Sequence, residues 1–496
     1  MQQLKERLAE IADLQGAVAV LEWDQQTYMP PGGAAGRAEQ MATLHKLAHE
    51  KFIAPEIGAL LADLQDWATT ADPEADDTCL VIRVSRDYAR ACKVPAELVA
   101  EIARTTGIAH SIWAQARAAK DFSLFRPLLE KIFALRRQEA MCFAPPASLY
   151  DPLLDDYEPA LQTPQLQAIF NHLKANLIPL AQAIIARPAP DDAFIYYHYG
   201  EKAQWQWGIE LIRQLGYDFK RGRQDLAVHP FTTALSLGDI RITTRIYPHC
   251  LTSALMSTLH ECGHALYDQG ISPTLARTPL AAGASLGIHE SQSRLWENIV
   301  GRSWHFWSYF YPKLQKTFPH NLGTVSLDSF YAAINKVQPS LIRVEADEIT
   351  YNLHILLRFE LEVDVLEGRL EVADLPAAWN TKVKEYLGLE VPDDSQGVLQ
   401  DVHWSDGYIG YFPTYTLGNI IAAQLYTCAI QEQPTILEDI ARGEFGHLLH
   451  WLRRKIHCHG RKYLPQDLIQ RATGQPLDVA PYLAYLRQKY TDLYHL

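Results

Sequence analysis

Apolar residues recur at steps of three and four along most of this 496-residue chain. That spacing places them on one face of an α-helix, and such helices pack together to bury their apolar faces. Clear examples are Leu4, Leu8, Ile11 and Leu14 near the start and Leu448, Leu449, Leu452 and Ile456 near the end. The pattern therefore predicts a mainly helical, all-α type of fold.

Helix breakers separate the periodic segments at Pro30–Gly33, Pro145–Pro146, Pro188–Pro190 and residues 392–394. The sequence contains neither an internal repeat nor a low-complexity linker that would divide independent domains. Hydrophobic residues make up 48% of the chain, which is enough for a large core. We therefore expect a single helical domain over residues 1–496.

One segment departs from the helical pattern. Residues 232–236 and 239–246 read as two short strands around a glycine turn at Leu237-Gly238, because the second stretch alternates β-branched or apolar residues with polar ones. We expect a small β-hairpin or short sheet beside the helix that follows it. The edge of such a sheet can pair with an extended peptide.

A His-Glu-x-x-His pentad, His260 to His264, lies in the helical segment Met256–Asp268. Residues four apart share one face of a helix, so His260 and His264 can bind one metal ion. Glu261 lies beside that ion, where a carboxylate can polarise a water molecule. Cys262 leaves the helix on another face and is expected to be a small packing residue.

Catalytic zinc sites use three protein ligands and one water, so a third ligand is needed. A second helical segment, residues 287–298, offers Glu290 and Glu297 on one face and His289 beside them. Helical spacing leaves all three open as the third ligand. A glutamate that does not bind the metal can brace a ligand histidine. His457 and His459 are two residues apart, diverge on a helix, and are not expected to bind a metal.

Composition excludes several other classes of function. The net charge of −13 disfavours nucleic acids and anionic membranes as partners. The apolar runs are too short to span a bilayer, and the amphipathic start is unlike a secretion signal, so we expect a cytoplasmic protein. Seven cysteines without a Cys-x-x-Cys pair argue against a disulfide framework and a cysteine zinc site.

The pentad together with His289-Glu290-Ser291-Gln292-Ser293-Arg294 resembles the carboxypeptidase Taq family of zinc metallocarboxypeptidases. The resemblance extends over the whole chain, with Cys262 as its one small departure. Further matching stretches are Leu21–Pro30 with Arg37 and Gln40, Tyr150–Pro159, Asp239–Thr243, Ile342–Glu348, Gly397–Trp404 and Gly410–Tyr415.

The resemblance implies that His260, His264 and Glu290 bind Zn²⁺ and that Glu261 is the general base and acid. It also implies a deep central groove, with the domain in one or two lobes beside it, and assembly as a homodimer. A His-His-Glu site accepts Co²⁺ or Mn²⁺ as well as zinc. The expected activity is release of C-terminal amino acids from peptides by zinc-activated water.

Further candidates follow from what this reaction requires. A phenol can donate a hydrogen bond to the oxyanion, so Tyr415 is the first candidate for that role and His403 the second. An arginine fork matches a carboxylate, so Arg343 and then Arg241 are expected to bind the substrate's C-terminus. The family comparison suggests that Asp239 to Thr243 close the groove beyond that residue.

Two other functions remain open. An endo-acting zinc oligopeptidase would carry the same pentad but would cleave peptides whose C-terminus is blocked. A zinc-binding scaffold that binds peptides without cleaving them is the alternative of another class. Glu261 argues against the scaffold, because binding alone has no use for a base beside the metal.

Overall fold

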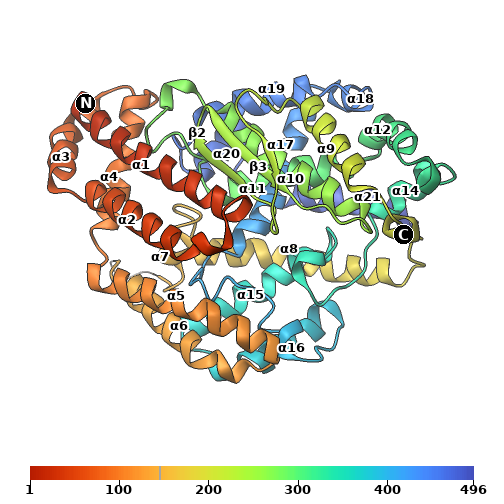
Figure 1. The fold of residues 1–496 in the computed structure, drawn as a ribbon, viewed down its shortest axis with the longest axis horizontal. Helices are drawn as coiled ribbons and strands as arrows, with labels where there is room; N and C mark the ends of the chain where they lie inside the picture. Colours follow the sequence, from red (N-terminus) through yellow and green to blue (C-terminus); the bar gives the residue numbers. More distant parts are fainter. Residues whose placement is uncertain (144–146) are drawn as a thin grey trace. The chain divides into compact units, whose positions relative to one another are not determined.

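The structure is a computed structural model that describes residues 1–143 and 147–496 (Figure 1). The predicted break at Pro145–Pro146 lies outside the described residues. Helices dominate and one small sheet is present, so the predicted fold class is confirmed. Within the described ranges, no helix has both the length and the apolar character needed to cross a membrane.

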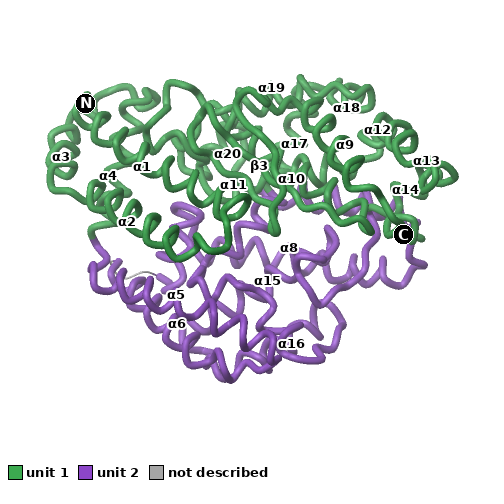
Figure 2. The backbone as a smooth tube through the Cα atoms, in the orientation of Figure 1, with its two compact units in different colours: residues 1–92, 191–334, 421–477 green, residues 93–190, 335–420, 478–496 purple. Residues whose placement is uncertain are grey.

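The chain divides into two compact units, each built from three chain segments (Figure 2). Unit 1 comprises Met1–Cys92, Asp191–Ile334 and Ile421–Leu477, and unit 2 comprises Lys93–Pro190, Asn335–Ile420 and Asp478–Leu496. Helix α17, Pro413–Glu432, runs from unit 2 into unit 1. The prediction of a single domain stays a prediction.

The α-helices of unit 1 are α1 Gln2–Thr27, α2 Ala34–Phe52, α3 Pro55–Thr70, α4 Asp76–Ala91, α9 Glu201–Leu215, α10 Leu251–Gly270, α11 Leu286–Arg294, α12 Trp304–Thr317, α13 Pro319–Leu322, α14 Leu327–Ile334, α18 Ile436–Ala441, α19 Gly446–Lys455 and α20 Pro465–Thr473. Those of unit 2 are α5 Ala96–Ala119, α6 Arg126–Met141, α7 Asp151–Leu154, α8 Thr163–Ile185, α15 Thr350–Leu366, α16 Leu375–Leu387 and α21 Ala480–Tyr494. Shorter helical turns are η1 Pro31–Gly33, η2 Phe122–Leu124, η3 Ala193–Tyr196, η4 Pro273–Leu275, η6 Arg343–Glu345, η7 Val372–Asp374, η8 Asp394–Gln396 and η9 His457–His459, and η5 Leu295–Val300 is a π-helix.

The sheet of unit 1 has three strands in the order β1-β3-β2. Strands β2, Thr232–Ser236, and β3, Asp239–Thr244, form the antiparallel hairpin that the sequence predicts, with Ala234 opposite Ile240. Strand β1, Gln224–Leu226, pairs in parallel with β3 and was not predicted, because three residues carry no periodicity. Ile240 is fully buried, and strand β3 packs against α10.

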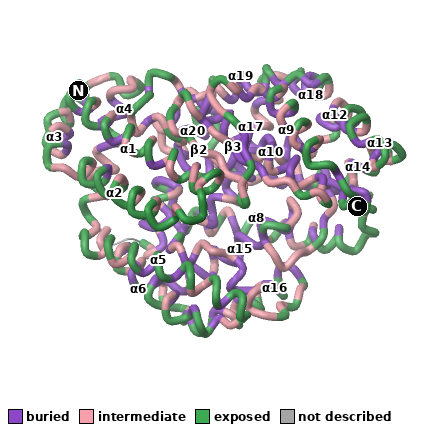
Figure 3. The backbone as a smooth tube through the Cα atoms, in the orientation of Figure 1, coloured by how far each residue is buried: buried purple, intermediate pink, exposed green. Residues whose placement is uncertain are grey.

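Helix α10 lies at the centre of unit 1 and is buried around nearly its whole circumference (Figure 3). It packs against α9, α11, η5 and the sheet. Gly263 permits the contact with α11, because a Cβ atom at this position would lie 2.5 Å from the carbonyl oxygen of Gln292. Two backbones thereby approach closely at the pentad.

Candidate metal centre

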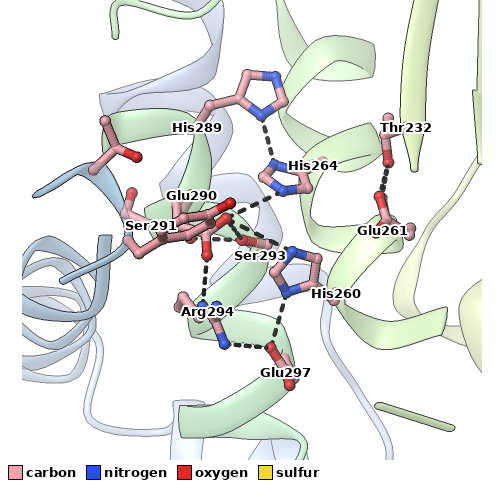
Figure 4. Close-up of polar contacts among 12 residues, drawn as sticks. Thr232, His260, Glu261, His264, His289, Glu290, Ser291, Ser293, Arg294 and Glu297 are labelled. Carbon is pink, nitrogen blue, oxygen red and sulfur yellow. Dashed lines mark hydrogen bonds and ion pairs between the residues drawn. The ribbon is translucent and has the colours of Figure 1, made fainter. Parts of the chain in front are cut away.

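The side chains of His260, His264 and Glu290 converge between α10 and α11 (Figure 4). Their ligand atoms all lie within 4.8 Å of one another. The Oε2 atom of Glu290 is 3.6 Å from Nε2 of His260 and 3.4 Å from Nε2 of His264. Two imidazole nitrogens and one carboxylate oxygen form the donor set of a catalytic zinc site.

Local sequence explains this convergence. The hydroxyl of Ser285 accepts a hydrogen bond from the N–H of Ile288 and caps the start of α11, one turn before Glu290. Gly263 brings that helix against α10 between the two histidines. The cap and the close approach together direct Glu290 toward the pentad.

Glu297 lies in the π-helix η5. It contacts Nδ1 of the His260 ring, whereas Glu290 lies near Nε2. The Oε2 atom of Glu297 is 2.8 Å from Nδ1 of His260. Because the carboxylate accepts the proton of Nδ1, the Nε2 atom of the ring is turned toward Glu290. Burial opposes ionisation of Glu297, but Arg294 and His260 outweigh it and lower the pKa of this carboxyl to about 2.

Arg294 holds both glutamates in place. Its Nε donates to Oε1 of Glu290 at 2.6 Å, and its Nη1 donates to Oε2 of Glu297 at 3.2 Å. Burial again opposes ionisation, yet Arg294 and the histidines hold the pKa of the Glu290 carboxyl far below its usual value. Since Oε1 is engaged by Arg294, Glu290 presents Oε2 to the histidines as a single charged ligand atom.

The residues present fit a divalent metal ion. Nδ1 of His264 lies 2.6 Å from Nδ1 of His289, so this ring, like that of His260, is held at Nδ1 and turns its Nε2 toward Glu290. Lone pairs of two nitrogens and an oxygen would repel one another at these distances unless a proton or a cation lay among them. Burial lowers the pKa of His264 to about 4, which keeps this ring neutral as a ligand requires.

Glu261 is buried beside the donor set and points toward the sheet (Figure 4). The hydroxyl of Thr232 in β2 donates to its Oε2 atom at 2.6 Å. Burial raises the pKa of the Glu261 carboxyl above its usual value. A carboxylate held in position with a raised pKa suits a general base, since proton transfer is most efficient when the pKa lies near the working pH.

The candidate substrate residues of unit 1 lie on β3. Arg241 forms a two-point ion pair with Asp239, at 2.9 and 2.7 Å, and its guanidinium carbon stacks 4.3 Å from the ring centre of Trp23. The buried Thr243 hydroxyl accepts from the N–H of Phe231 at 2.8 Å. The guanidinium group of Arg241 is therefore paired with a carboxylate of its own strand. The hydrogen bond of Thr243 connects β3 to the residue before β2.

The other candidates gather in unit 2 around Asp401. Arg343 is buried and donates from Nε and Nη2 to Oδ1 of Asp401, at 2.9 and 2.7 Å, while Arg358 donates to Oδ2 at 2.7 Å. Nε2 of His403 lies 3.1 Å from the hydroxyl of Tyr415. Burial lowers the pKa of His403 to about 4, so this imidazole is neutral at pH 7.

Some residues of the site were not anticipated from the sequence. Thr232 lies within a predicted strand, but nothing in the sequence indicates its hydrogen bond to Glu261. Asp268 contacts His289, and Arg294 was read only as part of a motif, although its spacing of i+4 from Glu290 is a signal for an ion pair on a helix. Cys262 is buried, as expected for a packing residue.

Comparison with known proteins identifies the family. The family model described as "Carboxypeptidase Taq (M32) metallopeptidase" matches residues 3–490. Thermostable carboxypeptidase 1 of Thermus thermophilus is 43% identical, over 99% of this chain and 98% of that protein. This chain belongs to the carboxypeptidase Taq (M32) metallopeptidase family. The predicted family and enzyme class, a metallocarboxypeptidase, are thus confirmed.

Two further proteins match this chain over comparable lengths. Carboxypeptidase 1 of Bacillus subtilis is 38% identical and matches 99% of this chain and 97% of its own. The solved structure of an M32 carboxypeptidase from Deinococcus radiodurans R1 is 44% identical and superposes with a TM-score of 0.97, covering 100% of this chain and 99% of that one. The M32 fold is therefore present over the full chain.

Proposed function

We propose that this M32 carboxypeptidase binds one Zn²⁺ through Nε2 of His260, Nε2 of His264 and Oε2 of Glu290 and removes C-terminal residues from peptides. The observation that carries the proposal is the close approach of these three atoms. Each of the three side chains also has a second polar contact that fixes its orientation: Glu297 for His260, His289 for His264 and Arg294 for Glu290. When bound, the metal acts as a Lewis acid on water and on the peptide carbonyl. Co²⁺ and Mn²⁺ are the expected substitutes.

Glu261 is proposed to move the protons of the reaction. It takes a proton from the attacking water onto its carboxylate and later gives that proton to the nitrogen of the departing amine. The hydrogen bond from Thr232 to Oε2 fixes the rotamer of Glu261. Its burial keeps bulk water from competing for the same proton.

Arg343 is proposed to bind the substrate's C-terminal carboxylate. Within the cluster of Arg343, Arg358 and Asp401, two buried cations share one carboxylate, which leaves one positive charge. A buried positive charge favours an anionic ligand, because an uncompensated charge is costly away from water. Arg241 is the second candidate, with Asp239 and Thr243 beside it on β3.

Tyr415 is proposed as the hydrogen-bond donor to the oxyanion, with His403 as the second candidate for that role. Their contact holds the tyrosine hydroxyl at a defined position, 3.1 Å from Nε2 of a neutral imidazole. A phenol donates a hydrogen bond without bringing a charge that would compete with the metal. Cytoplasmic location, a homodimer and the absence of nucleic-acid or membrane partners stay predictions from sequence.

Mass spectrometry of a short peptide tests the proposal. The zinc-loaded protein should shorten the peptide stepwise from its C-terminus and leave the same peptide intact when its C-terminus is an amide. The Glu261→Gln variant should bind zinc and cleave neither peptide. Internal cleavage of the amidated peptide would instead identify an oligopeptidase, and zinc binding without any cleavage would identify a scaffold.

A further inference from the structure

His289 lies between a proposed metal ligand and a buried carboxylate (Figure 4 shows its contact with His264). Its Nδ1 is 2.6 Å from Nδ1 of His264, and its Nε2 is 3.0 Å from Oδ1 of Asp268. Both ring nitrogens are therefore engaged by the chain. These contacts favour a place for His289 behind His264 over the role of third ligand, which the sequence left open.

Asp268, His289 and His264 form a chain of hydrogen bonds, and the groups at its two ends determine which nitrogen atoms carry protons. The Asp268 carboxylate only accepts, so Nε2 of His289 carries the proton at that end. A metal on Nε2 of His264 takes the lone pair of that nitrogen, so neutral His264 carries its proton on Nδ1. Nδ1 of His289 is then the acceptor between them, and all the hydrogen bonds are satisfied with neutral rings.

The His289 ring is also held in place by its surroundings. The ring of Tyr267 lies 5.2 Å away, centre to centre, and the Tyr267 hydroxyl accepts from the N–H of Ala284 at 3.1 Å. A Cβ atom at Gly283 would come within 2.9 Å of the imidazole. Tyr267 and Gly283 therefore restrict movement of the His289 ring.

We propose that Asp268 and His289 are positioning residues for His264. They set its tautomer and ring orientation through a relayed carboxylate, whereas Glu297 performs the same task for His260 by direct contact. The inference rests on the proposed function, since it takes His264 as a metal ligand. It assigns to His289 and Asp268 a role that is neither ligation nor proton transfer to the substrate.

The dissociation constant of Zn²⁺, measured by competition with a chromogenic chelator, tests this role in the full chain. Replacing His289 by leucine removes the acceptor and should weaken zinc binding by about 10- to 100-fold. His289→Asn keeps an amide oxygen near the position of Nδ1, so its Kd should lie closer to that of the wild type. Asp268→Ala should weaken binding less than His289→Leu, because the imidazole acceptor remains.

His457→Leu is the matched control. His457 is also a buried histidine, it lies 5.1 Å from the same Tyr267 ring, and it bonds to Gln292 of α11 at 2.9 Å. It contacts none of the three proposed ligands in the part of the chain that the structure describes. This variant should lower the urea midpoint while keeping the wild-type Kd and the absorption spectrum of the Co²⁺-loaded protein.

The possible results separate the two proposals. A wild-type chain that fails to bind one zinc per chain would overturn the metal site itself, and the role of His289 with it. Normal wild-type binding with an unchanged Kd in both His289 variants would overturn only the positioning role. Equal loss of affinity in His289→Leu and His457→Leu would show a general effect of destabilisation and would also overturn it.

Discussion

The substitution Glu362→Gln should remove a pH dependence from the stability of unit 2. Glu362 in α15 is fully buried, and the oxygens of its carboxyl group accept from the hydroxyl of Tyr150 at 2.8 Å, from Nε1 of Trp404 at 2.7 Å and from the N–H of Gly410 at 3.1 Å. These contacts anchor the segment that carries His403. Burial raises the pKa of Glu362 from 4.5 to about 7 despite the three donors.

The sign and the size of the effect follow from linkage. Above pH 4.5 the carboxyl ionises in the unfolded chain but stays protonated in the folded chain up to about pH 7. The unfolded state therefore binds fewer protons in this window, and the free energy of unfolding falls as pH rises. The difference between the two pKa values corresponds to about 3 kcal/mol at pH 8, of which about 2–3 kcal/mol is lost between pH 5 and pH 8.

Urea unfolding at pH 5 and pH 8 measures this difference. The wild type should lose about 2–3 kcal/mol more between the two pH values than the Glu362→Gln variant, since glutamine does not titrate. Contributions of other groups cancel in the comparison. The exposed Glu130→Gln in α6 serves as the matched control and should follow the wild type. Equal slopes for Glu362→Gln and the wild type would refute the argument and show that Glu362 is ionised in the folded chain.

Other substitutions test the site directly. Glu297→Gln replaces a charged partner of His260 by a neutral one and should weaken zinc binding about 10-fold, whereas the exposed Glu210→Gln should leave it unchanged. Arg343→Ala should raise KM at least about 10-fold for free-acid peptides without changing metal content, because it removes a charged hydrogen bond to the substrate; equal loss of zinc would contradict that role. Gly263→Ala should disrupt zinc binding and stability by separating α10 from α11, whereas Gly36→Ala, with open space around its Cα, should do neither.

The fold class could be predicted from the sequence because helical periodicity is a local signal, and the hairpin because β-branched alternation is another. Strand β1 could not, since three residues paired to a distant strand show no pattern of their own. The chain segments that make up each of the two units could not be predicted either. Each unit combines segments that lie far apart in the chain, and their association depends on tertiary packing.

The candidate ligands were predictable for a similar reason. His260 and His264 share one helix face, and helical spacing narrowed the third ligand to a few residues that only resemblance could separate. The partners behind the ligands were predictable only in part. A glutamate that braces a ligand histidine was expected, and Glu297 contacts His260 from a π-helix whose wider turn changes the direction of the side chain. Asp268 and Thr232 act through contacts across elements, which spacing along one helix does not show.

X-ray diffraction from crystals of the zinc-loaded protein, recorded at the zinc absorption edge, tests the metal site most directly. We expect one anomalous peak per chain, about 2.0–2.2 Å from Nε2 of His260, Nε2 of His264 and Oε2 of Glu290. A peak bound by Glu297 or His289 in place of Glu290, or one located away from the pentad, would contradict this expectation.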